Sequence, residues 1–413
     1  MGYKKDVIKG VSWYGFLRIA TKVIGFLEAI ILARILAPEQ FGAYAVALLA
    51  LGMLEVLTET GVNIFLVQEK SIDKYINSAW IVSILRGIII MIILLLTAPV
   101  ISNFFHSPES LALLYFISFV PLIRGFINPS IVKFQKDLLF GKDFWFRFII
   151  LVIDTAVSII FTVITQNPMG IVIGLITGVF VETVLSYFVV SPRPRFQIEK
   201  DYISKIFHRG KWITASTVFD YLFHNADNIV VGRLLGAASL GVYQLAYSIA
   251  VMPLSEVGKV FLHVVMPILV KIANDSSRLK SAFLKTVLSI GIITLIPSLV
   301  IFFFPQIFVW ILGEKWSSLT SVLPVLAALG FVKSLSAAPY TLFLSSKKQE
   351  YTTVVTLITI LGLVIPILPL VQLYGLFGAG LSALIGSVLA IPFLIYYTFR
   401  ILRSLPLHPE KIV

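Results

Sequence analysis

The sequence predicts an all-α integral membrane protein, with twelve transmembrane helices in two pseudo-symmetric six-helix lobes around a central cavity. Three observations lead to this fold class. Hydrophobic residues occupy 58% of the 413 positions and the mean hydropathy is +0.97, which is far more apolar than a soluble domain. The apolar residues form stretches long enough to cross a membrane, and the first helical hairpin recurs in the middle of the chain.

Twelve apolar stretches have the length of a membrane span. They lie near residues 10–34, 40–64, 77–100, 110–132, 144–165, 169–190, 210–235, 240–266, 283–305, 317–340, 351–371 and 375–400. A helix rises 1.5 Å per residue, so about 20 residues cross the roughly 30 Å of hydrocarbon in a bilayer. The spans are too long for β-barrel strands. The connecting loops have no more than about 20 residues, too few for a separate soluble domain.

The distribution of basic residues predicts the orientation. Twelve spans place both termini on one side, and of the 33 Lys and Arg residues only Arg34, Arg233 and Lys315 fall on the opposite side. The positive-inside rule therefore places both termini in the cytoplasm, with the chain in the cell (cytoplasmic) membrane. The net charge of +12 then reflects orientation and contact with anionic membrane lipids, and no nucleic-acid partner is expected.

The first hairpin recurs 199 residues later. The matched pairs are Trp13 and Trp212, Glu28 and Asp227, Arg34 and Arg233, Leu36 and Leu235, Gly42 and Gly241, and Tyr44 and Tyr243. An acid followed six residues later by an arginine in both copies is harder to attribute to chance than matched apolar residues. Because each half holds six spans, the repeat is parallel, a common plan in transporters. We predict an N-terminal lobe at 1–190, a cytoplasmic linker at 191–209 and a C-terminal lobe at 210–413.

Six basic residues lie inside predicted spans, all in the cytoplasmic half. They are Arg18, Lys22, Arg86, Arg124, Lys259 and Lys333. Ionisable groups in a bilayer are costly, so they are candidates for function. One interpretation is a cationic cavity open to the inner leaflet that accepts an anionic head group, since a guanidinium bonds two phosphate oxygens at once. The other is ion pairing that only fixes packing. Glu55 and Glu59 lie at similar depth, opposite Arg18 and Lys22, and each pair is spaced i,i+4.

Acidic residues inside the spans form a second group of candidates. Asp220 and Asp227 on the seventh span are seven residues apart and therefore share a helix face. A carboxylate in a low-dielectric cavity can exchange a proton or help to hold Na⁺, or it can simply be hydrogen-bonded in the packing. The same alternatives of pairing or ion coupling apply to Glu28, Asp154 and Glu182 on the first, fifth and sixth spans.

The remaining candidates are two arginines, and no catalytic constellation is found. Arg34 and Arg233 occupy matching positions at the outer ends of their helices, where they act either as interfacial anchors or as a basic exit mouth. The five histidines lack metal-ligand spacing, and the chain has no cysteine. We therefore expect no catalytic residue, no metal site and no cofactor other than H⁺ or Na⁺ as a coupling ion.

The first hairpin also carries a family resemblance. The segment Leu32–Tyr44, LARILAPEQFGAY, follows a helix that opens with GVSW at Gly10–Trp13. It resembles the first hairpin of Wzx-type polysaccharide flippases, in the multidrug/oligosaccharidyl-lipid/polysaccharide exporter (MOP) superfamily. The resemblance implies alternating access between two lobes, which moves a polyprenyl-(pyro)phosphate-linked oligosaccharide from the inner to the outer leaflet for O-antigen, capsule or exopolysaccharide synthesis. It also implies that cationic cavity residues bind the diphosphate, with Arg18 and Lys22 as the positions carried over.

The resemblance also suggests partners and leaves alternatives. A polysaccharide polymerase and glycosyltransferases are expected to act on the same lipid-linked oligosaccharide. A cation-coupled multidrug exporter of the same superfamily is the first alternative, although a cavity with six basic residues would repel its often cationic substrates. A membrane-embedded polysaccharide polymerase or acyltransferase is the second, and the short loops argue against it. The third is a scaffold in which the buried charges serve only packing.

Overall fold

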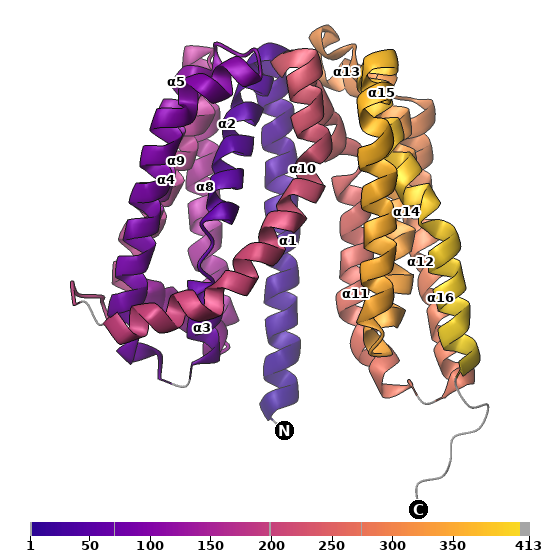
Figure 1. Ribbon diagram of the computed structural model, residues 1–413, viewed down its shortest axis with the longest axis horizontal. Helices are drawn as coiled ribbons and strands as arrows, with labels where there is room; N and C mark the ends of the chain where they lie inside the picture. The colour runs from indigo at the N-terminus through magenta and orange to yellow at the C-terminus, as the bar shows by residue number, and fades with distance from the viewer. Residues whose placement is uncertain (1, 70, 198–199, 274, 405–413) are drawn as a thin grey trace, which may run out of the picture. The chain divides into compact units, whose positions relative to one another are not determined.

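The computed structural model describes residues 2–69, 71–197, 200–273 and 275–404, and within these ranges every regular element is a helix (Figure 1). The chain forms two compact units. Unit 1 comprises Met1–Asn225 and Gly236–Gly241, and unit 2 comprises Ala226–Leu235 and Val242–Val413. The predicted all-α class is confirmed.

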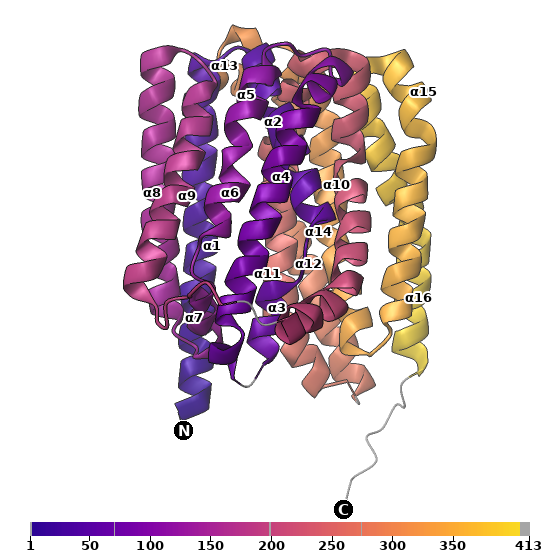
Figure 2. The ribbon, with the colours of Figure 1, turned by 60° about the vertical axis from the view of Figure 1, so that its left-hand side comes forward.

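Unit 1 contains the helices from the first half of the chain. These are α1 (Gly2–Ile35), α2 (Pro38–Leu57), α3 (Val62–Gln68), η1 (Ile72–Lys74), α4 (Ile76–Phe104), α5 (Ser110–Ile117), α6 (Phe119–Gly125), η2 (Pro129–Val132), α7 (Lys133–Lys136), α8 (Phe140–Thr165) and α9 (Met169–Val189). The short helices α3 and α7 lie at the end of the unit where α1 begins (Figure 2).

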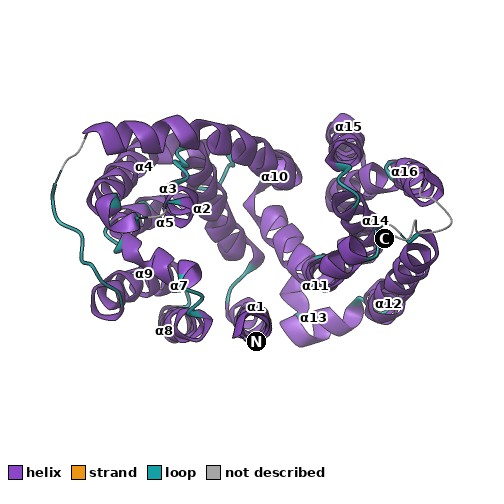
Figure 3. Ribbon diagram, turned by 90° about the horizontal axis from the view of Figure 1, so that it is seen from below, coloured by secondary structure: helices purple, strands orange, loops and turns teal. Residues whose placement is uncertain are grey.

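Unit 2 is built around one central helix. Its helices are α11 (Met252–Lys271), α12 (Ser276–Phe303), α13 (Gln306–Leu312), η3 (Glu314–Trp316), α14 (Leu319–Ser345), α15 (Gln349–Leu389) and α16 (Ile391–Ser404). Viewed along the helices, α14 lies among α11, α12, α15 and α16, and it packs against all four (Figure 3). A helix surrounded by neighbours has buried residues on every side, which explains why α14 shows no amphipathic pattern in the sequence.

Helix α10 (Lys200–Ala250) contributes to both units and bends at Gly236, where φ is +83° and ψ is 176°. A residue without Cβ adopts this left-handed backbone at little cost. Just beyond the bend, Gly241 packs on Gly42 within unit 1, because a Cβ added to Gly241 would lie 2.7 Å from the Gly42 nitrogen. These are the two glycines that the internal repeat matches.

Nine helices in the described ranges are long and apolar enough to cross a membrane, or ten if the bent pair Ser110–Gly125 and Pro129–Lys136 counts as one span. One of the nine, Gln349–Arg403, has 55 residues. It combines α15 with α16, and the backbone of α15 leaves the helical region at Gly375. A straight helix of that length would measure roughly 80 Å, more than twice the thickness of the hydrocarbon core. The chain is therefore a multi-pass membrane protein, and the number of twelve spans stays a prediction.

Close packing of α4 on α6 positions the site described below. A Cβ added to Gly87 on α4 would lie 2.3 Å from the Pro121 carbonyl oxygen, and one added to Gly125 on α6 would lie 2.8 Å from the Ser83 oxygen. Glycine at both positions lets the two backbones meet without intervening side chains. An apolar core of α2, α4, α5 and α9 residues, including Leu94, packs beside this contact.

Candidate functional site

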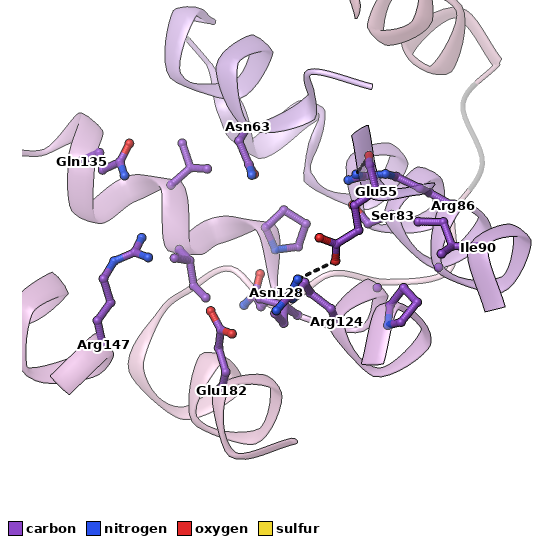
Figure 4. A pocket seen from close by; sticks show the side chains of 17 residues that line it. Glu55, Asn63, Ser83, Arg86, Ile90, Arg124, Asn128, Gln135, Arg147 and Glu182 are labelled. Atoms are coloured by element: carbon purple, nitrogen blue, oxygen red, sulfur yellow. Dashed lines mark hydrogen bonds and ion pairs between the residues drawn. The ribbon is translucent and has the colours of Figure 1, made fainter. Parts of the chain in front are cut away.

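A polar cavity of about 290 Å³ lies inside unit 1 (Figure 4). Its polar lining consists of Glu55, Asn63, Ser83, Arg86, Arg124, Asn128, Gln135, Arg147 and Glu182. These side chains come from seven helices, α2, α3, α4, α6, α7, α8 and α9, and from Asn128 at the start of the η2 turn. Because charged groups inside a membrane are costly, a collection of this kind marks a functional site by default.

A break in the predicted fourth span forms one wall of the cavity. The helices on either side of it, Ser110–Gly125 and Pro129–Lys136, are bent by 71°, and Asn128 and Pro129 line the cavity. The carbonyl oxygen of Phe126 accepts hydrogen bonds from Trp80 Nε1 at 3.1 Å and Tyr187 Oη at 2.7 Å. Non-helical backbone at membrane depth is tolerated where it is buried in protein or lines a cavity, and broken helices are typical of transporter binding sites.

Arg86 on α4 is held at the end of α2. Its Nη2 lies 3.2 Å from Glu59 Oε2 and donates to the Glu55 carbonyl oxygen at 2.6 Å, while Nε donates to Thr58 Oγ1 at 3.2 Å. The last carbonyls of a helix have no partner within the helix and carry its partial negative charge. The Arg86 guanidinium therefore caps α2 and neutralises Glu59 at the same time.

Arg124 on α6 neutralises the other acid of α2. Its Nη1 lies 2.6 Å from Glu55 Oε1 (Figure 4). The sequence placed Arg18 and Lys22 opposite Glu55 and Glu59, and the structure gives these carboxylates other partners. The reason is helix packing: α1 lies along α8, with Trp13 and Phe144 rings 5.0 Å apart, whereas α2 packs against α4 and α5.

Arg147 and Glu182 face the cavity from α8 and α9 (Figure 4). Arg147 Nε is 2.8 Å from Asp143 Oδ1, one turn earlier. Within the described part of the chain, Glu182 makes no hydrogen bond or ion pair. Sequence reasoning missed Arg147, which lies near the start of the fifth predicted span. The acid four residues before it, which is buried, was a signal for a pair at this position.

The other predicted residues of unit 1 lie outside this cavity. Lys22 is exposed and Arg18 is half-buried on α1. Glu28 accepts a hydrogen bond from Thr155 Oγ1 at 3.2 Å and interacts electrostatically with Asp154. Arg34 is exposed near the end of α1.

Unit 2 contains a separate polar cluster around Asp227, which is 5% exposed. Tyr243 Oη donates to Asp227 Oδ2 at 2.9 Å, and Lys333 Nζ donates to Tyr247 Oη at 3.0 Å. The Lys333 charge lies close enough to act on the Asp227 carboxylate. Asp227 and Tyr243 are the repeat counterparts of Glu28 and Tyr44. In the second copy, the matched acid therefore accepts a hydrogen bond from the matched tyrosine.

The remaining candidates of unit 2 are scattered. Lys259 is 54% exposed and pairs with Glu256 Oε1 at 2.8 Å, one turn away. Arg233 is exposed. Asp220 belongs to the unit 1 part of α10, and its side chain falls outside the described residues.

Replacing Tyr243 by Phe is expected to lower the stability of the protein. The side chain is fully buried, and the substitution removes the hydroxyl that Asp227 accepts from. Loss of a hydrogen bond to a charged group costs about 1.5–3 kcal/mol. The midpoint of thermal unfolding of the purified protein in detergent would measure this. Tyr374→Phe, at a position 58% exposed, is the matched control. An equal midpoint for the two variants would contradict the prediction.

A family model described as "Polysaccharide biosynthesis protein" matches residues 31–321. The lipopolysaccharide biosynthesis protein WzxC of Escherichia coli (strain K12) is 25% identical over 341 residues, which cover 81% of this chain and 69% of WzxC. The teichuronic acid biosynthesis protein TuaB of Bacillus subtilis (strain 168) is 21% identical over 345 residues, covering 80% and 69% of the two chains.

Two solved transporter structures have the same fold. The inward closed form of the lipid II flippase MurJ superposes with a TM-score of 0.72 at 16% identity, covering 95% of this chain and 88% of MurJ. An inward-facing multidrug resistance MATE family transporter of the MOP superfamily gives 0.63 at 16% identity, covering 93% and 96%. The MOP-type fold and the resemblance seen in the first hairpin are thereby confirmed. Since the family model covers most of the sequence, the chain belongs to the polysaccharide biosynthesis protein family.

Proposed function

We propose that the protein flips polyprenyl-(pyro)phosphate-linked oligosaccharide repeat units from the inner to the outer leaflet by alternating access. The product would feed the synthesis of a surface polysaccharide such as O-antigen, capsule or exopolysaccharide. The observation that carries this proposal is the charged cavity at a broken span, inside a unit of apolar, membrane-length helices. Family membership and the MurJ-like fold support it.

The cavity addresses the main physical obstacle to flipping. A sugar head group carries many hydroxyl groups, and each one that enters hydrocarbon without a hydrogen-bond partner costs several kcal/mol. Side chains such as Glu182, Arg147 and Asn63 offer partners within the bundle, while the lipid chain can stay in the bilayer. A protein of this kind moves its substrate without breaking a covalent bond and acts as a transporter rather than as an enzyme.

The diphosphate requires positive charge, and we assign this role to Arg18 and Lys22 on α1. They are spaced i,i+4 and so lie on one side of the helix. Lys22 is exposed, and in the described residues no ion pair joins it to a carboxylate. An arginine can contribute two parallel hydrogen bonds to phosphate oxygens, and a lysine adds a mobile point charge.

Energy for net export would come from an H⁺ or Na⁺ gradient. The carboxylates proposed for coupling are Glu28, Asp154 and Asp220 in unit 1 and Asp227 in unit 2. Both termini would face the cytoplasm, where glycosyltransferases assemble the oligosaccharide, and a polysaccharide polymerase would receive it on the outer side.

Reconstitution tests the proposal directly. The purified protein would be placed in liposomes with the organism's own polyprenyl-diphosphate oligosaccharide, labelled on the sugar. The fraction of label accessible to a membrane-impermeant quencher would be followed over time, with no gradient, with a pH gradient and with a Na⁺ gradient. Movement of the label above the rate in protein-free liposomes is expected. No excess movement under any of the three conditions would overturn the proposed function.

A further inference from the structure

Two arginines in the cavity of unit 1 are already paired with carboxylates, whereas other polar side chains of the lining have no partner among the described residues. Arg86 is bound to Glu59 and to the end of α2, and Arg124 is bound to Glu55. A phosphate would have to displace a carboxylate from either arginine. Such an exchange replaces one anion by another and gains little, since the desolvated pair already satisfies the guanidinium.

The polar side chains without partners include hydrogen-bond donors and hydrogen-bond acceptors. In the described residues, the side chains of Glu182, Asn63 and Gln135 make no hydrogen bond or ion pair, yet all three line the cavity. Figure 4 shows them approaching it from separate sides, together with Arg147. An ionised carboxylate only accepts, a guanidinium only donates, and an amide does both. The open positions of the cavity therefore include both donors and acceptors.

Glu182 and Arg147 face each other across this space without touching. They interact electrostatically, but within the described residues the ion pair of Arg147 is with Asp143, at 2.8 Å. A hydroxyl group placed between them can donate to the carboxylate and accept from the guanidinium at once. A phosphate oxygen placed there can only accept, and it would meet the like charge of Glu182.

We propose that the cavity is a saccharide-binding site, which recognises the hydroxyl groups of the sugar moiety and excludes the diphosphate. The inference rests on the proposed function and specifies which part of the substrate this site binds. A volume of about 290 Å³ is at the lower end of small-molecule sites and fits a single sugar ring better than a whole repeat unit. Asn63 on α3 and Gln135 on α7 are exposed and form the mouth, while the fully buried Asn128 lies at the inner wall.

Binding of two lipids by the purified full-length protein tests this assignment. The first is the polyprenyl-diphosphate oligosaccharide extracted from the source organism, and the second is undecaprenyl diphosphate without sugar. The rise of the unfolding midpoint with lipid concentration gives an apparent Kd for each. Glu182→Gln keeps the shape of the side chain and removes the negative charge. It is expected to weaken binding of the sugar-bearing lipid at least tenfold, and to leave the sugar-free lipid unchanged within a factor of two.

Two outcomes would overturn the saccharide assignment. One is unchanged binding of the sugar-bearing lipid by Glu182→Gln. The other is tighter binding of the sugar-free lipid, which is the result expected if Glu182 repels a diphosphate held in this cavity. Glu109→Gln, an exposed acid of the same unit, is the matched control and should behave as wild type with both lipids.

Two further variants keep the proposal testable if Glu182→Gln does not fold. If Glu182→Gln fails to give a monodisperse protein, Asn63→Ala and Gln135→Ala remove amides at the exposed mouth, and each is expected to weaken binding of the sugar-bearing lipid alone. The liposome assay separates this proposal from the function itself. Wild-type protein that moves no lipid would refute flipping, whereas movement with unchanged binding in all three variants would refute only the saccharide site.

Discussion

Arg18→Ala and Lys22→Ala are each expected to abolish surface polysaccharide while the protein stays inserted and abundant. A lipid diphosphate that enters the protein leaves water and its counterions, so it needs positive charge in the new environment. Neither residue forms part of the cavity in unit 1 or caps a helix there. Their removal should therefore affect substrate capture much more than folding.

The measurement is complementation of a strain that lacks the gene. Surface polysaccharide and membrane-inserted protein would be quantified together for each variant. Lys280→Ala, which removes an exposed cation of α12, is the control for a general loss of positive charge and should complement fully. Wild-type polysaccharide in both α1 variants would remove these two residues from the mechanism.

The second large effect is expected from Arg86→Met, which should destabilise the protein by about 2–3 kcal/mol. The substitution keeps a long side chain but removes the contacts that Arg86 makes with Glu59, Thr58 and the Glu55 carbonyl. Removing one member of a fully buried pair costs about 3–5 kcal/mol. The value is smaller here because the Arg86 and Glu59 side chains are 25% and 33% exposed, so that water compensates in part.

Thermal and denaturant unfolding in detergent would measure the loss, and a second variant would show its origin. Adding Glu59→Gln to Arg86→Met removes the carboxylate charge that Arg86 neutralises, and should restore at least 0.5 kcal/mol, as expected for two residues in contact. Lys259→Met breaks an exposed i,i+3 pair with Glu256 and should cost less than about 1 kcal/mol. Equal losses for Arg86→Met and Lys259→Met would show that the cap of α2 contributes no special stability.

The sequence was sufficient to predict most of the charged residues that belong to the site, but not which of them pair with one another. Arg86, Arg124, Glu55, Glu59 and Glu182 were identified because a charge within an apolar span is rare and costly. The structure brings these five together in and beside one cavity. Their partners could not be anticipated, because helices adjacent in the chain are not always adjacent in space. Glu55 pairs with Arg124 on α6, and Glu59 pairs with Arg86 on α4.

Other members of the site carry no signal of their own in the sequence. Asn63 and Gln135 are ordinary polar residues of short helices that cover the end of unit 1. Asn128 belongs to a span that looks continuous by hydropathy, and it becomes part of the cavity only because that span bends by 71°. The bend is stabilised by distant groups, such as Trp80 and Tyr187, which bond the freed carbonyl.

The membrane class, the helical fold and the family could be predicted from the sequence, because length, hydropathy and a local hairpin motif are properties of the linear chain. Packing of the helices was needed to show which acid neutralises which arginine and which polar groups stay open to a ligand. Glu182 and Asp227 illustrate this difference. Both are acids within apolar spans, yet one faces an open cavity without a partner among the described residues, and the other is buried against Tyr243. The energy of a charge in a protein is set by the neighbours that packing supplies, and the chain order does not specify them.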